Sequence, residues 1–442
     1  MQHSTATLDS ARYKGDPLAT KGSGSSIIGD IGFRILFFLI IYVILVIKIA
    51  SSASLNDHIL FSVYSLLITV YILSRFLLSY LHRSDPLPDG YEPSVSFVVP
   101  AKNEGDNIAA TLRCFFLSDY PKDKMEVIAI NDGSSDNTLE EMLKVQAEYG
   151  HLIKRFDVVD WEVNRGKREG MAAGVKMAKN DIVIFVDSDS FIRPDCIKHL
   201  VKYFTKPEVG AVSGHTDVYN ADTNLLTKMQ AVRYYIAFRI YKSAESVFGL
   251  VTCCPGCCSA YRREYLNEFL DAWLDQKFLG KKCTFGDDRS LTNFVLRKYQ
   301  AVYSVEARAA TVVPETFKVY LKQQQRWKKS WVRETLIACT FMWKKSPLAA
   351  AFFYIYVFLA LVAPIVFFRA VFWHPYQNEA LPFVYLLGLF LMLLLHGIYY
   401  RIEVGEKKWF LAIVTFWFNT LILIWQLPWA MVTISDNRWG TR

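Results

Sequence analysis

The sequence has little charge, and its cysteines do not follow the pattern of a secreted protein. Only 21% of the 442 residues are charged, whereas 52% are hydrophobic and 15% aromatic. A soluble globular chain carries about 25% charged residues. The 8 cysteines show no spacing typical of a disulfide framework, so we expect reduced thiols facing a cytosol. Disordered, collagen-like and disulfide-stapled classes are therefore excluded.

A large excess of positive charge is also missing. The chain has 50 Lys and Arg against 42 Asp and Glu, which gives a formal net charge of +8. This surplus suits an anionic membrane surface or a phosphate-bearing substrate. It is too small to indicate binding to nucleic acid, and we expect none.

Long apolar runs are what the chain does contain. Each approaches the ~20 residues that a helix needs to cross a bilayer. The runs cover residues 31–50, 58–81, 348–373, 381–400 and 409–433. The first is not a cleavable signal, because a long polar tail precedes it and a second apolar run follows closely. The sequence therefore predicts a multi-pass membrane protein.

Lys and Arg in the short flanks predict the orientation of these runs. The tail before the first run and the loop 401–408 carry Lys and Arg, whereas the loops 51–57 and 374–380 carry neither. We therefore expect the N-terminus and the large central region to face the cytoplasm at the plasma (inner) membrane. The fifth run contains Pro428 and is followed by a basic stretch, which favours a bent or re-entrant segment with a cytoplasmic C-terminus over a full crossing.

These features predict six parts along the chain. In order they are a cytoplasmic tail (1–30), two transmembrane helices (31–84), a cytoplasmic domain (85–317), an amphipathic interface helix (318–345), the C-terminal transmembrane segments (346–433) and a cytoplasmic tail (434–442).

The central domain alternates between short β-branched runs and helical stretches. This alternation predicts an α/β fold with a mostly parallel sheet and helices on both faces. The predicted strands are Val95–Val99, Glu126–Ile130, Phe156–Val159, Ile182–Val186 and Val209–Ser213.

Polar residues follow three of these strands at their carboxyl ends, where ligands bind in such folds. Lys102 and Glu104 follow the first strand, Asp132 the second, and Asp187 and Asp189 the fourth. Each group alone also fits a turn or helix cap, but three at one edge predict a binding site. Two carboxylates at this spacing suit Mg²⁺ or Mn²⁺, which bind one or two carboxylates plus substrate phosphates.

Two further stretches combine charge with a helix start. Lys167 and Arg168 follow Gly166 and fit either a phosphate clamp or a solvated loop. Asp287 and Asp288 precede a helix predicted at Ser290–Lys298, where an aspartate serves either as a cap or as a general base.

Two segments resemble helices that lie in a membrane interface. Lys318–Phe341 is basic and aromatic, and Thr227–Phe248 mixes Arg, Lys, Tyr and Phe. Between them, Cys253–Cys258 offers a Cys-x-x-Cys pair without the two further ligands that a structural zinc site requires. We expect that segment to form a tight loop of small residues beside a ligand.

Together these features resemble the processive membrane-embedded glycosyltransferases of family 2, which include cellulose, chitin and hyaluronan synthases. The family's Asp-x-Asp motif is similar to Asp187–Asp189, its later acidic motif to Gly286–Asp288, and its Gln-x-x-Arg-Trp motif to Gln323–Trp327. The chain resembles hyaluronan synthases most, over residues 30–442. That likeness includes Leu321–Ser330 and the ending Trp439–Arg442.

The resemblance implies a GT-A type, Rossmann-like cytoplasmic domain inserted between transmembrane helices. It implies a processive, inverting polymerisation of UDP-GlcNAc and UDP-GlcA into a β-linked polysaccharide, which leaves through the enzyme's own membrane channel. It also implies Mg²⁺ or Mn²⁺ at Asp187 and Asp189, contact with membrane lipids and a plausible monomer.

The resemblance also implies roles for individual residues. The nucleotide would contact Ala101, Lys102, Glu104, Asp132 and Asp187, with Lys167 and Arg168 near the diphosphate. Asp288, beside Asp287, would be the base, while Gln323, Arg326 and Trp327 would complete the catalytic group and Trp327 would stack on the acceptor sugar. Acceptor or channel contacts would come from Gly256, Cys257, Tyr261, Arg262, Trp327, Trp439 and Arg442.

One stretch departs from the hyaluronan synthase pattern. Cys254–Cys258 stands where that family usually has Ser-Gly-Pro, near the acceptor sugar. The choice of sugar therefore stays open between hyaluronan and an N-acetylglucosamine-only product of the chitin-oligosaccharide type. A non-processive transferase that loads a lipid carrier is a further alternative.

Overall fold

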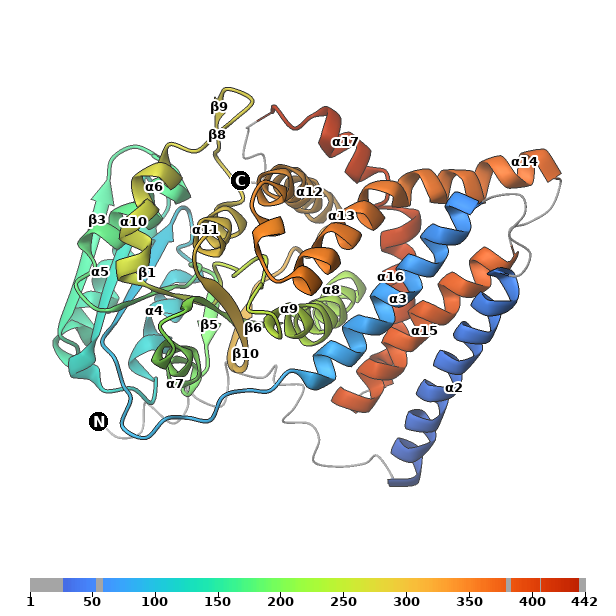
Figure 1. The fold of residues 1–442 in the computed structure, drawn as a ribbon. Coiled ribbons are helices and arrows are strands. Elements are labelled where there is room, and N and C mark those ends of the chain that lie inside the picture. The colour runs from blue at the N-terminus through green and yellow to red at the C-terminus, as the bar shows by residue number, and fades with distance from the viewer. Residues whose placement is uncertain (1–26, 53–58, 379–382, 406, 437–442) are drawn as a thin grey trace.

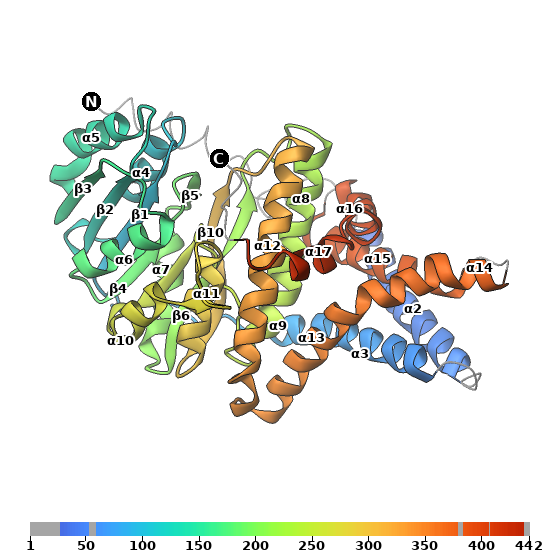
Figure 2. The ribbon, with the colours of Figure 1, turned by 90° about the horizontal axis from the view of Figure 1, so that it is seen from above.

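The computed structural model describes residues 27–52, 59–378, 383–405 and 407–436 (Figure 1). Within them, an α/β domain lies on one side and a group of long helices on the other, with helices α8 and α12 between the two (Figures 1 and 2). The predicted tail 1–30 lies mostly outside the described residues, and Trp439 and Arg442 lie wholly outside them.

The α/β domain is built on an eight-stranded sheet with the order β3-β2-β1-β4-β7-β6-β10-β5. A separate hairpin pairs β8 (Lys277–Phe278) with β9 (Lys281–Lys282). The strands of the main sheet are β1 (Val95–Ala101), β2 (Met125–Asp132), β3 (Arg155–Trp161), β4 (Ile182–Phe185), β5 (Ser190–Ile192), β6 (Val209–Val218), β7 (Ser259–Arg262) and β10 (Gln300–Thr311).

The predicted α/β class is confirmed, and the five predicted strands are present. Strands β3, β2, β1 and β4 are parallel, as are β6 and β10. Strand β7 runs antiparallel between β4 and β6, and β5 runs antiparallel to β10. The sheet is thus more mixed than the sequence predicts, because β5, β7 and β10 carry no β-branched run that marks them.

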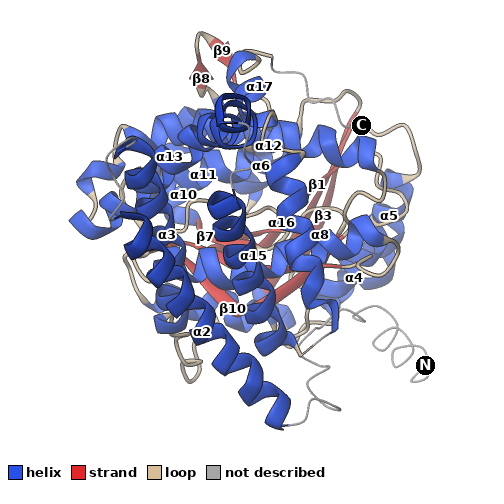
Figure 3. Ribbon diagram, turned by 90° about the vertical axis from the view of Figure 1, so that its right-hand side faces the viewer, coloured by secondary structure: helices blue, strands red, loops and turns tan. Residues whose placement is uncertain are grey.

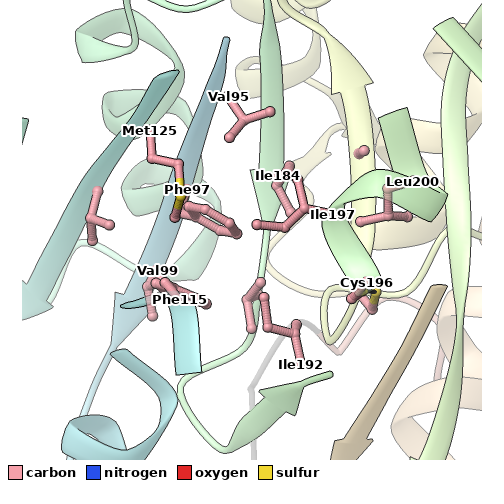
Figure 4. Packing of buried hydrophobic residues seen from close by; sticks show 14 of the residues in the cluster. Val95, Phe97, Val99, Phe115, Met125, Ile184, Ile192, Cys196, Ile197 and Leu200 are labelled. Atoms are coloured by element: carbon pink, nitrogen blue, oxygen red, sulfur yellow. Dashed lines mark hydrogen bonds between the residues drawn. The ribbon is translucent and has the colours of Figure 1, made fainter. Parts of the chain in front are cut away.

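Helices cover both faces of this sheet, and each face has its own apolar core. Phe97 and Val99 point to one face and Val98 to the other, as the two-residue period of a strand requires. The first core (Figure 4) is closed by α4 (Ile108–Phe116), α5 (Thr138–Tyr149) and α7 (Cys196–Val201). The second is closed by α6 (Lys167–Met177), α10 (Arg263–Leu274) and α11 (Asp287–Leu296).

Short 3₁₀ turns are η1 (Lys122–Lys124), η2 (Gly150–Leu152), η3 (Lys202–Thr205), η5 (Met342–Lys344) and η7 (Lys407–Trp409).

Within the described residues, four helical stretches are long and apolar enough to cross a membrane: Ile31–Ile49, Ser62–Leu81, Pro347–Gln377 and Tyr385–Val404. They agree closely with the first four predicted runs. The elements that contain them are α2 (Ile27–Ser52), α3 (Ile59–Leu81), α13 (Pro347–Phe368) with η6 (Arg369–Trp373) and α14 (His374–Asn378), and α15 (Phe383–Val404). Figure 3 shows these helices stacked in front of the sheet.

The fifth run forms a broken helix, as the sequence favours. Helices α16 (Phe410–Leu421) and α17 (Gln426–Val432) meet at an angle of 41°. The break precedes Pro428, which lies in the first turn of α17, where a proline is tolerated. Both ends of this segment contact the α/β domain: Lys408 Nζ lies 2.8 Å from Asp222 Oδ1, and Lys281 Nζ donates to the Ser435 carbonyl at 3.3 Å.

Two predicted interface helices connect the domain to the spans. The first is α12 (Phe317–Cys339). The second is interrupted: α8 (Leu225–Ile236) continues through a π-helical turn, η4 (Ala237–Lys242), into α9 (Ser243–Ser246). Apolar side chains of α8 and η4 share one buried cluster with residues of α2, α3, α15 and α16, so this helix is packed firmly against the membrane-spanning part.

Candidate active site

The strand register gathers the predicted site residues at one edge of the sheet. Ala101 at the end of β1 pairs with Asn131 near the end of β2, and Val98 pairs with Phe185 at the end of β4. Because β7 is antiparallel, its first residue, Ser259, pairs with Phe185 as well. The loop 253–258 that leads into β7 therefore lies at the same edge as the polar residues after β1, β2 and β4.

Gly256 marks the point where three sequence motifs meet. A Cβ on Gly256 would lie 2.7 Å from Asp187 Oδ1, 3.0 Å from Asp288 Oδ1 and 3.1 Å from Lys167 Nζ. The early acidic motif, the later acidic motif and the basic stretch before α6 thus converge on one small space. A side chain at position 256 would displace these three groups.

Asp187 and Lys167 form an ion pair inside this space. Lys167 Nζ lies 2.5 Å from Asp187 Oδ1, and both side chains are about one quarter exposed. Burial by itself lowers the pKa of Lys167, but the carboxylates of Asp187 and Asp288 outweigh it and raise the pKa above its ordinary value. Lys167 therefore stays charged and is placed to meet an anionic group.

Asp189 adds a second carboxylate to the same corner. Burial and the negative charge of Asp187 raise its pKa to about 6. A carboxyl group that is buried beside a second carboxylate ionises less readily than usual unless a cation binds close by. Among the described residues no group of three or more His, Cys, Asp or Glu is arranged to hold a metal. The pair fits a divalent cation of the Mg²⁺ type only together with oxygen ligands from a substrate.

Asp287 and Asp288 begin α11 and point to different surroundings. Gly286 precedes them with φ +76°, a conformation that favours glycine. Asp287 is buried and accepts from Arg168 Nε at 2.7 Å, while Arg168 Nη1 donates to the Trp273 carbonyl at 3.1 Å. This corrects the expected roles of both residues: Arg168 is 4% exposed and fastens α6 to α10 and α11, so it is not placed to bind a diphosphate.

Asp288 instead faces the shared space. Burial raises its pKa, the charges of Asp187 and Asp287 raise it further, and Lys167 opposes the change. The backbone N–H of Gly256 donates to its carboxylate. A carboxylate with a raised pKa beside a potential substrate position has the properties of a general base.

Helix α12 is fixed directly against the start of α11. A Cβ on Gly286 would collide with Ser330 Oγ, and the guanidinium of Arg333 donates to the Phe285 carbonyl. Arg333 also pairs with Glu334 at 2.8 Å. The contact leaves no room for α12 to shift relative to Asp288 without breaking buried hydrogen bonds.

The Gln-x-x-Arg-Trp residues of α12 lie beside the acidic space. Burial lowers the pKa of Arg326, and the carboxylates of Asp288, Asp287 and Asp187 act against that change, which places the guanidinium within their field. Trp327 is 38% exposed, and its ring centroid lies 6.4 Å from that of Tyr234. The buried Oε1 of Gln323 has no hydrogen-bond partner within the described residues, so it is available to a ligand.

The residues predicted to hold a nucleotide line the other side of the same edge. Asp132 accepts backbone hydrogen bonds from Arg165 at 2.6 Å and Gly166 at 3.0 Å, and it thereby fixes the loop before Lys167. Glu104 is buried and Oε2 accepts from Asn107 at 3.1 Å. Ala101 is buried at the strand end and Lys102 is partly exposed.

Tyr261 and Arg262 are not part of this site, which corrects the expected acceptor contacts. Tyr261 is 1% exposed and packs edge-on against Phe185. Arg262 pairs with Ile182 at the start of β4 and donates to the Phe204 carbonyl at 2.7 Å. Since β7 runs antiparallel, its far end lies at the opposite edge of the sheet.

Sequence reasoning missed two residues that line the space. Tyr234 of α8 contacts Trp327, and Thr216 of β6 lies with its Oγ1 3.0 Å from Cys257 Sγ. Cys257 is buried, and burial together with the charge of Asp187 raises the pKa of its thiol. Tyr234 carried a weak signal, an aromatic residue next to Arg233 in a predicted interface helix. Thr216 carried none.

Comparison with known proteins agrees with this geometry. The model of the glycosyl transferase family 2 matches residues 96–270. A hyaluronan synthase of Streptococcus pyogenes is 30% identical over 387 residues, which cover 86% of this chain and 90% of that protein. The chain belongs to glycosyl transferase family 2.

Other relatives of this glycosyltransferase place it within the family more broadly. An N-acetylglucosaminyltransferase of Rhizobium meliloti is 35% identical over 296 residues, which cover 65% of this chain and 68% of that protein. The mannosyltransferase PcManGT of Pyrobaculum calidifontis, solved with GDP-Man and Mn²⁺, has a similar fold, with a TM-score of 0.60 and 22% identity over 86% of this chain and 99% of that one. The glycosyltransferase thus has a GT-A-like fold with its acidic motifs at one edge of the sheet.

Proposed function

We propose that this glycosyltransferase is a processive, inverting polymerase of the hyaluronan synthase type, which joins UDP-GlcNAc and UDP-GlcA into a β-linked polysaccharide. One observation carries the proposal: carboxylate oxygens of Asp187 and Asp288 both lie within 3.0 Å of the point that a Cβ on Gly256 would take. The residue proposed to act on the leaving group and the residue proposed as the base thus face the same space. Trp327 lies beside this space, on the same helix as Arg326.

The chemistry follows from this placement. Asp288 takes the proton of an acceptor hydroxyl, whose oxygen forms a bond to the anomeric carbon. The bond from that carbon to the UDP oxygen breaks, and UDP leaves with the electron pair. Attack from the face opposite the leaving group converts an α-linked donor into a β-linked product, in the same way as base and leaving group act from opposite faces in inverting glycosidases.

The remaining site residues bind and orient the substrates. Ala101, Lys102, Glu104 and Asp132 surround the nucleoside, and Lys167 and Arg326 face the diphosphate. Trp327 stacks on the apolar face of the acceptor sugar, next to Gly256 and Cys257. Gln323 supplies its unpaired oxygen to the acceptor side.

Asp187 and Asp189 fit a divalent cation, Mg²⁺ or Mn²⁺. When bound with the substrate, such a cation neutralises the negative charge that develops on the diphosphate. The placement of the two carboxylates supports this assignment, because both directly follow β4 at the edge of the sheet where Lys167 also lies.

The membrane-spanning helices support passage of the product through the enzyme itself. Interface helices α8 and α12 carry Tyr234 and Trp327 and separate the site from α3 and α13 (Figure 2). We propose that the catalytic domain faces the cytoplasm at the plasma membrane, that a monomer forms the channel, and that Trp439 and Arg442 contribute to it.

The decisive experiment is replacement of Asp288 by Asn in the purified full-length enzyme. Polymer formation from UDP-GlcNAc and UDP-GlcA with Mn²⁺ should fall by at least ~10²-fold, the order of a lost general base, while the dissociation constant for UDP stays within about twofold of the wild-type value. An equal loss of transfer and of UDP binding contradicts the proposed role.

A second candidate is an N-acetylglucosamine-only polymerase. It is favoured by the cysteine-containing loop 253–258 and by the similarity to the N-acetylglucosaminyltransferase of Rhizobium meliloti. Each UDP-sugar should be supplied alone and both together, and the products digested with hyaluronidase and with chitinase. Polymer from UDP-GlcNAc alone supports the second candidate, and products of a single added sugar contradict both polymerases.

A further inference from the structure

Arg75 is a buried cation within a membrane-spanning helix. It lies in α3, inside the apolar stretch Ser62–Leu81, and is only 3% exposed. Among the described residues it forms no ion pair, and its Nε has no hydrogen-bond partner. Within the part of the chain that the structure describes, its guanidinium donates one hydrogen bond, from Nη2 to Ser74 Oγ at 3.4 Å.

Such an arrangement is costly unless the cation has a function. A buried charge that forms no ion pair destabilises a protein, and ionisable residues inside spans usually mark a substrate path. The guanidinium is held between two rings, with its carbon 4.7 Å from the centroid of Tyr71 and 4.3 Å from that of Phe352. These rings orient the group but leave its hydrogen-bond donors unused.

Arg75 belongs to a small group from the three helices α3, α9 and α13, which we name the Arg75 cluster: Tyr71, Arg75, Glu245, Phe352 and Tyr356. Tyr71 and Tyr356 stack with centroids 5.8 Å apart. The Glu245 carboxylate accepts from the Thr252 backbone N–H at 2.9 Å; its charge acts on Arg75, but the two form no ion pair among the described residues. The cavity between these side chains is about 30 Å³, which is space for a water molecule, so the cluster is closed in this structure.

The cluster lies directly beyond the acceptor side of the active site. Trp331 is one helical turn after Trp327 on α12, and its ring centroid lies 5.8 Å from that of Tyr356. Cys253, in the loop that carries Gly256, feels the charges of both Asp288 and Glu245, so this loop is near both the proposed base and the cluster. A chain that leaves Trp327 toward the spans meets these aromatic residues next.

We infer that Arg75 binds the carboxylate of uronate units in the polysaccharide as the growing chain passes from the active site into the spans. The inference rests on the proposed function, and it applies to polysaccharides that contain uronate units. An arginine fork forms paired hydrogen bonds with a carboxylate, and the surrounding tyrosines present faces on which sugar rings stack. A neutral polymer would leave the cation unpaired. A lipid headgroup at the bilayer surface does not reach a side chain buried to this degree.

The test compares an acidic with a neutral oligosaccharide on the full-length enzyme in detergent. The probes are an alternating GlcNAc–GlcA tetrasaccharide and chitotetraose, with binding measured on the wild type, Arg75→Gln, Arg75→Lys and Arg34→Gln. Arg34 is an exposed arginine of α2 outside the cluster and serves as the matched control. We expect Arg75→Gln to weaken binding of the acidic probe at least about tenfold, the scale of a lost charge-assisted hydrogen bond. Binding of the neutral probe should be unaffected by that substitution, and Arg75→Lys should restore most of the difference.

Equal effects of Arg75→Gln on both probes overturn the inference, as does no effect on either. Glu245→Gln provides a separate measurement if Arg75→Gln does not fold. Because it removes the nearest negative charge, it should tighten binding of the acidic probe alone, and unchanged binding contradicts the inference. A wild-type enzyme that makes no glucuronate-containing polymer contradicts the proposed function. If the wild-type enzyme makes this polymer but Arg75→Gln binds the acidic probe normally, only the role of Arg75 is contradicted.

Discussion

Adjacent residues of α11 illustrate how one acidic motif serves two purposes. Asp287 is turned inward and neutralises Arg168, whereas Asp288 is turned toward the substrate space and has a raised pKa. From sequence alone the two aspartates are equivalent. The left-handed turn at Gly286 and the ion pair on one side of the helix distinguish them.

Asp287→Asn should therefore destabilise the enzyme, because it leaves the buried charge of Arg168 without a partner. We expect a loss of about 3–5 kcal/mol in unfolding free energy, measured by thermal unfolding in detergent. Asp271→Asn is the control. It breaks an exposed ion pair with Lys176 and should cost less than about 1 kcal/mol. Unaltered unfolding in Asp287→Asn contradicts the buried-pair interpretation.

Gly256→Ala tests whether the three motifs share one space. The added methyl group would meet Asp187, Asp288 and Lys167 at 2.7–3.1 Å, so these side chains must move apart. Polymer formation should drop ~10²-fold, as expected when reacting groups are displaced by an ångström, with little change in unfolding temperature. Gly32→Ala is the matched control, because a Cβ there meets nothing within 4 Å. Normal turnover in Gly256→Ala would show that the loop is not the wall of the site.

At the scale of elements, the pairing of β6 with β10 depends on a buried charged group. Arg308 donates to Asp217 from Nε at 3.0 Å and Nη2 at 2.9 Å, and His215 lies 3.3 Å from the same carboxylate. Burial alone raises the pKa of Asp217, but the charges and hydrogen bonds of His215 and Arg308 outweigh it and hold the pKa below the ordinary value.

This depressed pKa gives a direction for pH dependence. The ionised Asp217 contributes stability above the ordinary aspartate pKa of 3.8, and the contribution is lost as the pH falls from there through the lower folded-state pKa. Asp217→Asn should lower the unfolding temperature at pH 7. The difference in unfolding temperature between wild type and Asp217→Asn should be constant above pH 3.8 and should narrow as the pH falls below that value, in scans at several pH values. A gap that is constant down to pH 3 argues against a charge effect.

The sequence predicts the edge of the sheet that carries the chemistry but not the whole sheet. Asp132 and Asp187 stand out because polar residues after apolar runs are visible in a linear pattern, and Asp288 stands out through its place before a helix and the resemblance to the family's later acidic motif. Strand β7 has only four residues and no alternation, so its antiparallel insertion, and with it the position of Tyr261 and Arg262, was not predictable. The inward turn of Arg168 was equally hidden, since ion pairs between distant segments leave no local pattern.

At the scale of the whole molecule, the C-terminal segment is placed by contacts between distant parts of the chain. The sequence predicts a bend, and the structure places the break between α16 and α17. Asp222 contacts the start of this segment and Lys281 contacts its end, so both ends lie at the α/β domain. The number of Lys and Arg residues in the flanks does not reveal these contacts.

We therefore expect an epitope tag fused after Arg442 to lie on the same side of the membrane as the catalytic domain. In sealed vesicles, added protease should remove the tag only where it also digests the α/β domain, because the last described residues, including Ser435, contact that domain. Detergent-opened vesicles give the reference for complete digestion. A tag protected while the domain is digested indicates a full crossing by 410–432.

The tight seat of Gly286 on Ser330 has a consequence for how product advances. The contact joins α11 and α12, the two helices that carry Asp288 and Trp327. The proposed base and the proposed stacking residue should therefore move together. A ratchet in which α12 slides forward with the sugar would carry the reacting carboxylate away from its next partner. If the enzyme is processive as proposed, the product must advance by moving past these two helices while they stay in place, or through movement of the outer helices.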